Sequence, residues 1–257
     1  MAAFLMCLAA FLAGGLTLFS GFGLGTLLMP VVALFLPVKT AIAVTAVVHL
    51  ANNLAKLALV GRFAKRTIVF RFGIPALFAS MGGALVLQWL SDLAPLARYD
   101  WLGHQFEVLP VKAAIAALLI AFLYVEARAP EYQWRFDDRY LPLGGLLSGF
   151  FGGLSGHQGA FRSAYLINAG LTKEQFLGTS VVIACLVDVA RLGVYGTSMS
   201  LMTAQASPFL LLAIISAALA GTVVAARFIH VVTMKAIRAL ISMLLIVIAV
   251  GLGTGMI

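Results

Sequence analysis

The sequence predicts an all-α polytopic membrane protein made of two inverted repeats, each a glycine-broken helical hairpin followed by three transmembrane helices. The 257 residues are 63% hydrophobic and 10% charged, with a mean hydropathy of +1.08, well above that of soluble domains. The apolar runs, roughly 15 to 23 residues long, match the ~20 that a helix needs to cross the bilayer, and they lack the alternation of a barrel strand. Together with an internal repeat, these runs predict about 8–10 membrane segments.

The elements of the first half follow from its apolar runs. No Lys or Arg precedes the first run, so we expect it to be a membrane segment rather than a cleaved signal peptide. Glycines interrupt it, which makes 4–36 a broken hairpin whose arms, about 10 to 16 residues, are short for a full crossing. The hairpin is therefore a candidate re-entrant segment, which must be buried in protein. Spans are then expected at 41–60, 68–90 and 111–125.

The second half repeats this order. The stretch NNLAKLALVG at 52–61 aligns with VDVARLGVYG at 187–196, and the same offset places Ser20-Gly21 on Ser155-Gly156. The small residues of ASMGG and AALAG are also equivalent, and their spacing favours close helix contacts. The second half is expected to contain a broken hairpin at 141–169 and spans at 176–195, 208–229 and 235–255. We divide the chain into a first repeat at 1–125, a cytoplasmic linker at 126–140 and a second repeat at 141–257.

Equivalent loops of the two repeats carry opposite charge patterns. The loop 61–71 holds four basic residues and no acid, whereas its counterpart 196–207 is uncharged. The next connection reverses this difference, because 91–112 holds three acids and 227–238 has only basic charges. Since cytoplasmic loops are enriched in Lys and Arg, equivalent loops lie on opposite sides of the membrane. Each repeat then crosses the membrane an odd number of times, with the linker inside and both termini outside.

The remaining composition excludes several classes of protein. The net charge of +8 does not indicate nucleic-acid binding, because the 17 Lys and Arg residues lie mostly in short loops, as membrane orientation requires. Cys7 and Cys185 lie in separate apolar runs, where free cysteine behaves as a small hydrophobe rather than as part of a disulfide framework. We expect no cofactor and no metal ion. The expected partners are the lipid bilayer and a small solute, and a homodimer is left open.

The glycine-rich breaks are the first candidate binding site. SGFGLGT at 20–26 and SGHQGAF at 155–161 would each start a half-helix whose free N–H groups and dipole favour an anion. Arg162 would lie in the first turn of the second half-helix and add its charge, with His157 and Gln158 beside it. The alternatives are that the glycines only form tight turns, that Arg162 extends to the membrane interface, and that His157 is a packing residue.

The first long span of each repeat adds a polar face. Its members are Thr45, His49, Asn52, Asn53 and Lys56 in the first repeat and Ser180, Asp188 and Arg191 in the second. Ionisable groups inside a span usually face the bundle interior and mark a solute or proton path. As alternatives, Lys56 and Arg191 reach the membrane interface, or Asp188 and Arg191 simply neutralise each other. We therefore favour the asparagines and the breaks over these cations.

Short motifs along the chain resemble one family of permeases. A glycine-broken hairpin followed by LLMP, and spans that open with TAIAVTAVV and KEQFLGTSVV, resemble the TauE/SafE sulfite exporter family over nearly the whole chain. The resemblance implies a secondary transporter, not an enzyme, that exports sulfite, sulfonates or related organic anions across the cytoplasmic membrane. The family's GxGGG-like breaks read GFGLG and GHQGA here, and its GTS element is Gly178, Thr179 and Ser180. These motifs therefore indicate the family but leave the anion open.

The residues and the resemblance together predict a substrate site and a set of coupling groups. The substrate site is expected to contain Ser20, Gly21, Gly23, Asn52, Asn53, Ser155, Gly156, His157, Gln158, Gly159, Arg162, Thr179 and Ser180. Proton coupling or charge relay is expected of His49, Lys56, Asp188 and Arg191. At this stage a coupled proton and simple movement of the anion down the membrane potential are both open.

A rhomboid-like intramembrane serine hydrolase is the main alternative function. GLSG at 153–156 resembles the GxSG element of rhomboid proteases, with Ser155 as nucleophile and a histidine such as His49 as base. We rank this below transport because Ser-Gly recurs at the same place in the other repeat, as an architectural feature would. A cation carrier is also less favoured, because Asp188 is the one carboxylate in the expected spans.

Overall fold

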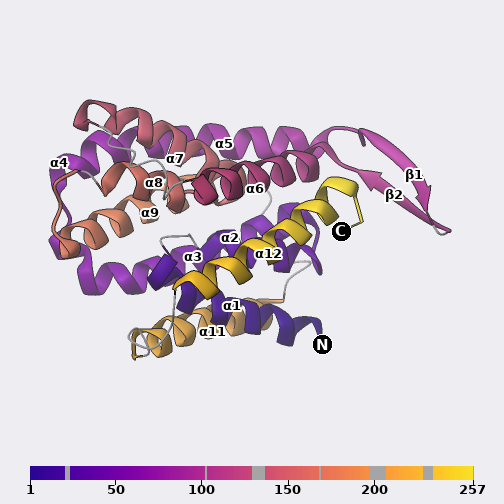
Figure 1. Cartoon of the computed structure of the whole chain (residues 1–257), viewed down its shortest axis with the longest axis horizontal. Helices are drawn as coiled ribbons and strands as arrows, with labels where there is room; N and C mark the ends of the chain where they lie inside the picture. The colour runs from indigo at the N-terminus through magenta and orange to yellow at the C-terminus, as the bar shows by residue number, and fades with distance from the viewer. Residues whose placement is uncertain are drawn as a thin grey trace.

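A computed structural model describes residues 1–20, 24–101, 103–128, 137–167, 169–196, 207–227 and 234–256, most of them in helices that run roughly along one axis (Figure 1). The first half contains α1 (Ala2–Ser20), α2 (Leu24–Ala33), α3 (Val38–Val60), a 3₁₀ turn (Gly61–Phe63), α4 (Arg66–Ile68), α5 (Ile74–Asp92) and α6 (Pro110–Arg128). The second half contains a 3₁₀ turn (Asp138–Tyr140), α7 (Leu141–Ser155), α8 (Gly159–Leu166), α9 (Lys173–Tyr195), α11 (Pro208–Arg227) and α12 (Met234–Thr254). The described part of the chain is mostly helical, as predicted, and its long helices lie close to the ranges expected for the hairpin arms and spans.

The predicted span at 68–90 is not a uniform α-helix. A π-helical turn, Val69–Gly73, separates α4 from α5. This wider turn directly precedes Pro75, which has no N–H to bond to the carbonyl of Arg71. Both this turn and α5 pack against α7, and a Cβ on Gly145 would overlap the carbonyl oxygen of Phe72 in the turn.

The chain is mostly helical, as expected of an all-α membrane protein, but the connection 91–112 contains a β-hairpin that was not predicted. Strands β1 (Ala97–Trp101) and β2 (His104–Val108) pair antiparallel, with Tyr99 opposite Phe106. Directly before β2, Gly103 has a φ of +79°, a conformation that favours glycine. Tyr99 Oη donates a hydrogen bond of 2.6 Å to the carbonyl of Thr254, so the hairpin projects beyond the helices beside the end of α12 (Figure 1).

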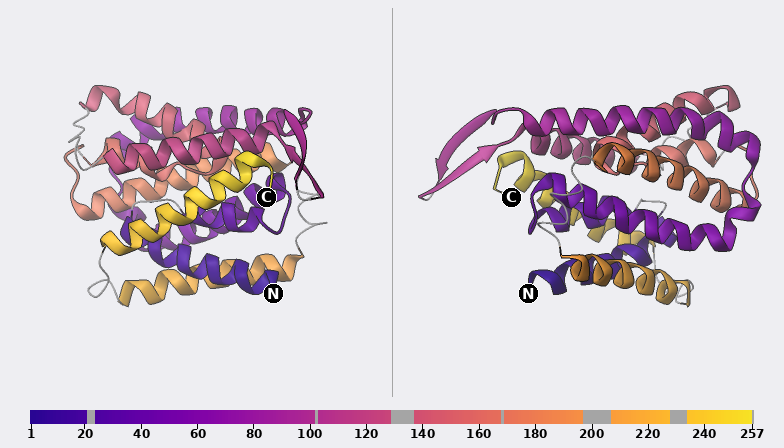
Figure 2. Two further views of the ribbon diagram at one scale, coloured as in Figure 1. Left: turned by 45° about the vertical axis from the view of Figure 1, so that its right-hand side comes forward. Right: turned by 180° about the vertical axis from the view of Figure 1, so that it is seen from behind.

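Two tight helix pairs, α5 with α7 and α1 with α11, lie on opposite sides of the bundle (Figure 2). A Cβ on Gly149 of α7 would overlap the carbonyl oxygen of Ala76 in α5. A Cβ on Gly14 of α1 would overlap the carbonyl oxygen of Ala218 in α11 in the same way. The backbones of each pair are therefore in direct contact, as small-residue stripes permit in membranes. Between the outer pairs, α3 packs on α9 and α6 packs on α12.

The two ends of the bundle contain different connections. At one end, Arg71 Nη2 donates to the carbonyl of Asp138 at 3.2 Å, which places the start of α7 beside the α4 turn. At the other end, Lys39 Nζ and Asp92 Oδ1 form an ion pair of 2.5 Å between the start of α3 and the end of α5. Both chain termini lie at this second end, near the β-hairpin (Figures 1 and 2).

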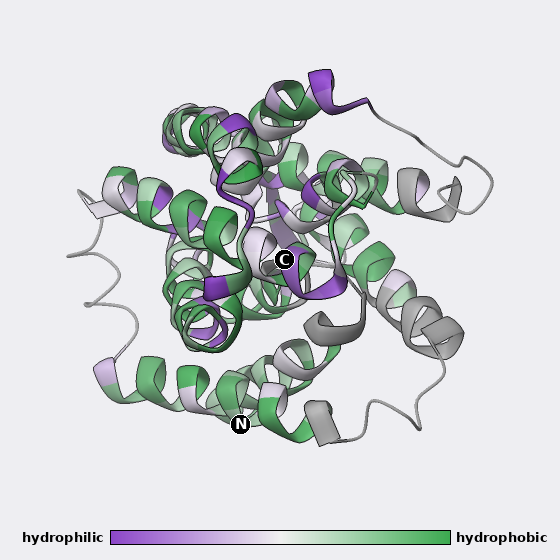
Figure 3. Cartoon of the chain, turned by 90° about the vertical axis from the view of Figure 1, so that its left-hand side faces the viewer, coloured by the Kyte–Doolittle hydropathy of each residue, from purple (hydrophilic) through white to green (hydrophobic). Residues whose placement is uncertain are grey.

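The outer surface of the bundle is apolar, as a lipid environment requires. Among the described residues, four helical segments are long and apolar enough to cross a membrane: Val38–Phe63, Arg66–Asp92, Lys173–Tyr195 and Pro208–Ala225. Large apolar side chains point outward, including Phe78, Trp89 and Phe209, which are 66%, 61% and 82% exposed. Hydrophobic residues predominate along the helices in the end view (Figure 3). The chain is therefore an integral membrane protein.

Candidate functional site

The break between α7 and α8 forms one wall of a buried polar cluster. α7 ends at Ser155, and Gly156 follows with a φ of +83°, the left-handed conformation that ends many helices. His157 and Gln158 then connect to α8, which starts at Gly159 and places Arg162 in its first turn. The helix is thus interrupted between α7 and α8, and Arg162 lies one turn beyond the interruption. Gly159 does not share the positive φ of Gly156, so its role is to begin the helix rather than to make the turn.

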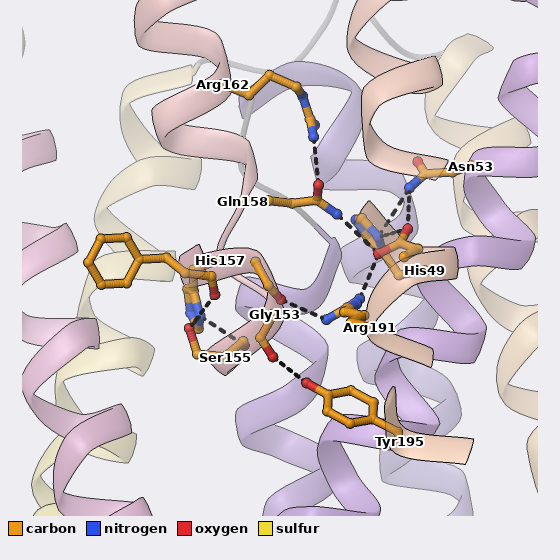
Figure 4. A network of polar contacts seen from close by, with 12 residues as sticks. His49, Asn53, Gly153, Ser155, His157, Gln158, Arg162, Arg191 and Tyr195 are labelled. Atoms are coloured by element: carbon orange, nitrogen blue, oxygen red, sulfur yellow. Dashed lines mark hydrogen bonds and ion pairs between the residues drawn. The ribbon is translucent and has the colours of Figure 1, made fainter. Parts of the chain in front are cut away.

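Asp188 of α9 lies at the centre of the cluster and is 0% exposed. Its Oδ2 lies 2.6 Å from His49 Nδ1 and accepts a 2.9 Å hydrogen bond from Asn53 Nδ2, both on α3. Its Oδ1 accepts from Gln158 Nε2 at 3.0 Å. Arg191 Nη2 lies 2.8 Å from the same oxygen as an ion pair, although its N–H bonds are not aligned with that oxygen. Four nitrogen atoms thus surround this carboxylate (Figure 4).

Gln158 joins this carboxylate to Arg162. The Nε2 of its amide donates to Asp188, and its Oε1 accepts from Arg162 Nη1 at 3.0 Å. Arg162 is only 9% exposed, and its Nε has no hydrogen-bond partner among the described residues. The Arg162 guanidinium is therefore a buried cation with unused donor capacity, rather than a side chain that extends to the interface.

Arg191 and Tyr195 hold the end of α7 in place. Arg191 Nη1 donates to the carbonyl of Gly152 at 3.2 Å, and Tyr195 Oη donates to the carbonyl of Gly153. These carbonyls belong to the last turn of α7, and that of Gly152 also accepts the backbone N–H of Gly156 at 3.0 Å. Arg191 thus neutralises Asp188, as the spacing suggested, and it also caps a helix. Arg191 thus contacts both a carboxylate and a helix end, whereas Arg162 donates to the neutral amide oxygen of Gln158.

His157 lies in the same break but faces a different set of side chains. Its Nδ1 lies 2.9 Å from Ser155 Oγ and 3.0 Å from the Ser155 carbonyl. The ring stacks on Phe122 of α6, with centroids 5.3 Å apart. Its Nε2 is buried and has no partner among the described residues. His157 is thus packed among aromatic rings while one nitrogen stays unpaired.

Not every predicted site residue joins the cluster. Thr179 Oγ1 accepts from the backbone N–H of Lys65 at 2.9 Å, which fixes a loop instead of facing a solute. Asn52 Oδ1 accepts from Thr222 of α11 at 2.9 Å. Buried polar atoms without a partner among the described residues include Thr45 Oγ1, Ser180 Oγ and Asn52 Nδ2. Lys56 is half-buried on α3.

The first hairpin's candidates are only partly visible. Gly21 and Gly23 lie outside the described residues, and Ser20 is described only as the last residue of α1. The break between α1 and α2 is thus bounded by Ser20 and Leu24, at the position expected from the repeat. We therefore derive the geometry of the site from the second break alone.

The sequence did not point to three residues that support the site. Ser148 Oγ donates to the carbonyl of Gln158 at 2.9 Å and so fixes the start of α8. Thr222 holds Asn52, and Tyr195 holds α7. Ser148 and Thr222 are adjacent to glycines of the small-residue stripes, which is the signal that could have indicated their proximity to another helix.

The serine hydrolase alternative finds no support in this geometry. The His49 ring contacts Asp188 and Asn53, whereas Ser155 Oγ donates to the carbonyl of Phe151 at 3.1 Å. Among the described residues, no group of three His, Cys, Asp or Glu side chains is placed to hold a metal ion.

The fold and the cluster define a multi-pass membrane protein whose polar, charged groups are gathered between apolar helices. The family model described as sulfite exporter TauE/SafE matches residues 6–252, so the chain belongs to this family of transport proteins. A search of curated proteins and a search of solved structures give no significant match. The family therefore establishes the class, a permease of the sulfite exporter type, and leaves the substrate to be argued from the site.

Proposed function

We propose that this protein is a secondary transporter that exports small sulfur-containing anions, such as sulfite or sulfonates, across the cytoplasmic membrane. The substrate binds beside Arg162, at the start of α8 and near the middle of the membrane. The observation that carries this proposal is the unbalanced charge of the buried cluster.

The charge balance favours a monovalent anion. Among the described residues, the buried Asp, Glu, Lys and Arg side chains are Arg162, Asp188 and Arg191. Asp188 neutralises Arg191, which leaves Arg162 with only the neutral oxygen of Gln158 as its partner. A buried charge is costly unless it is paired. One bound anion would supply the missing charge and could accept from the unused Nε of Arg162.

The helix break favours the same ligand. α8 begins at Gly159, two residues before Phe161 and three before Arg162, so its first N–H groups and the guanidinium lie on one short segment. The first N–H groups of a helix have no intrahelical acceptor, and they carry the positive end of the dipole. A sulfite or sulfonate group offers three oxygens, enough to accept from both kinds of donor.

We further propose that the chain consists of two inverted repeats, 1–125 and 141–257, joined by a cytoplasmic linker, with both termini outside. The helix pairs support this, because α5 packs on α7 and its counterpart α11 packs on α1. Asn53 and Asp188, which the sequence alignment of the repeats places at equivalent positions, contact each other. Such a contact is expected where a pseudo-two-fold axis passes between α3 and α9.

Transport requires this site to open toward each side in turn. Gln158, Asp188 and Arg191 are at most 1% exposed, and Arg162 is 9% exposed. The cluster is therefore closed to solvent, and a solute reaches it only after the helices around it rearrange, as alternating access requires.

Flux measurements in proteoliposomes test the proposal. We expect the purified protein to transport at least one of sulfite, sulfate, taurine or sulfoacetate. Replacing Arg162 by Gln should weaken affinity for that anion by about 1–3 kcal/mol, the range for charge-assisted hydrogen bonds. Arg66→Gln removes the same charge from an exposed site and should leave affinity unchanged. Equal dissociation constants for Arg162→Gln and the wild-type protein would remove Arg162 from the substrate site.

A further inference from the structure

The buried cluster contains a group that can bind a proton next to the proposed anion site. His49 and Asp188 are 3% and 0% exposed, and their Nδ1 and Oδ2 atoms are 2.6 Å apart. In so close a pair, an added proton belongs to the pair rather than to either residue, and it raises the charge of the pair by one. The pair therefore has two charge states, which differ in their electrostatic effect on neighbouring groups.

Gln158 connects this pair to Arg162, and the chemistry of the two groups that it contacts fixes the orientation of its amide. A carboxylate only accepts hydrogen bonds and a guanidinium only donates them, so the amide must direct Nε2 to Asp188 and Oε1 to Arg162. The Gln158 side chain is fully buried, and its backbone carbonyl accepts from Ser148 Oγ. The amide thus links the carboxylate of α9 to the cation of α8 without an intervening water.

We infer that a proton on the His49–Asp188 pair and an anion at Arg162 bind cooperatively, with Gln158 as the positioning residue between them. This inference rests on the proposed function, because it requires an anion beside Arg162. A proton raises the positive charge of the cluster by one and weakens the hold of Asp188 on the Gln158 amide. Both effects favour an anion at Arg162. By thermodynamic reciprocity, anion binding then takes up a proton.

Other ionisable groups near the pair come from several helices. They are Lys56 on α3, Cys185, Arg191 and Tyr195 on α9, Arg162 on α8 and His157 in the break. α7 has no ionisable side chain, and the one on α5, Asp92, is exposed and paired with Lys39 at the end of the bundle. His157 is the other imidazole that ordinarily titrates near neutral pH, so the test must separate it from the pair.

Calorimetric titration of the purified wild-type protein with methanesulfonate tests the linkage. This probe stays a monoanion from about pH 5 to pH 9, so any pH dependence belongs to the protein's groups. We expect the dissociation constant to rise with pH by up to about tenfold per pH unit, the limit for one linked proton. In buffers that differ in ionisation enthalpy, the heat of binding should report uptake of close to one proton. This measurement needs no variant.

Three variants assign the proton. Asp188→Asn fixes the charge at its protonated value, so it should bind methanesulfonate tightly at every pH and take up no proton. Gln158→Met should still bind the anion at low pH but with a smaller dependence on pH. Asp92→Asn removes an exposed carboxylate and should keep the wild-type dependence.

Each outcome separates this inference from the proposed function. Failure of the wild-type protein to bind any of the tested anions at any pH would overturn the proposed function. Binding whose affinity does not change with pH would overturn the inference alone. A folded Asp188→Asn protein that keeps the wild-type pH dependence would place the proton elsewhere, such as on His157, and would also overturn it. If Asp188→Asn does not fold, the proton uptake of the wild-type protein decides whether the linkage exists, and Gln158→Met decides whether it passes through the amide.

Discussion

Gly156 is the residue on which the shape of the helix break depends most. Its φ of +83° is readily accessible to glycine and strained for other residues, and a Cβ there would lie 3.1 Å from Arg191 Nη1. We expect Gly156→Ala to lower the free energy of unfolding by about 1–2 kcal/mol, measured by thermal or denaturant unfolding in detergent. Gly193→Ala is the matched control, because Gly193 is helical and a Cβ there meets open space. Equal stability of the two variants would mean that the turn does not require glycine.

At the residue scale, sequence reasoning succeeded where the signal was local. The left-handed glycine and the position of Arg162 in the first turn follow from neighbouring residues, so both could be predicted. The role of Gln158 could not, because it depends on α8 and α9 lying side by side. Thr179 was assigned to the substrate site for its motif, but its hydroxyl group bonds to the loop after α3. The presence of a hydroxyl group in a sequence motif does not show which part of the fold that group will contact.

At the element scale, the small residues of α7 and α5 determine how closely these helices pack. Gly149 lies against the Ala76 carbonyl, so Gly149→Ala should force the helices apart and lower the free energy of unfolding by about 1–3 kcal/mol. Gly82→Ala in α5 adds the same methyl group where nothing lies within 4 Å, and it should be neutral or slightly stabilising. Thermal unfolding of the two variants in detergent gives the comparison. A Gly149→Ala protein as stable as the Gly82→Ala protein would show that the contact between α5 and α7 can accommodate a methyl group.

The small-xxx-small spacing identified the contact faces of α5 and α11 but not their partners. Gly83 and Gly221 both face another helix backbone, as predicted. That the partners are α7 and α1 depends on the path of the whole chain. The β-hairpin was not predicted, because its two five-residue strands lie in a polar connection whose charges indicated only a loop. Its local signal was the alternation around Tyr99 and Phe106, with Gly103 between them.

For the whole molecule, the reversed Lys and Arg pattern predicts which loops face the cytoplasm. In a protein without Cys7 and Cys185, cysteines at 64 and 233 should react with an impermeant reagent only from the cytoplasmic side, and those at 100 and 201 only from outside. Residue 64 lies just before α4 and residue 100 in β1, and these two elements lie at opposite ends of the bundle (Figure 1). Residues 201 and 233 lie outside the described residues. Labelling of 64 and 201 from the same side would contradict the inverted repeat.

The order of the long helices was predictable at this scale because the bilayer imposes a length on each apolar run. The side of the bundle on which each helix lies was not predictable, because apolar residues cover nearly every face of these helices. The polar residues at the centre of the bundle are an exception. Asn53, His49 and Asp188 were recognisable as inward-facing, since an isolated polar group in lipid has no other stable position.

The pairing of α1 with α11 has a consequence for how the chain is made. A ribosome delivers α1 well before α11, with about 190 residues between them, at roughly 5–20 residues per second. α7 meets α5 soon after it emerges, whereas α1 waits on the order of ten seconds or more for its partner. During that time we expect the glycine face of α1 to contact lipid or a component of the insertion machinery. Truncated chains that stop before α11 should therefore remain associated with that machinery, although α5 and α7 are both already present in them.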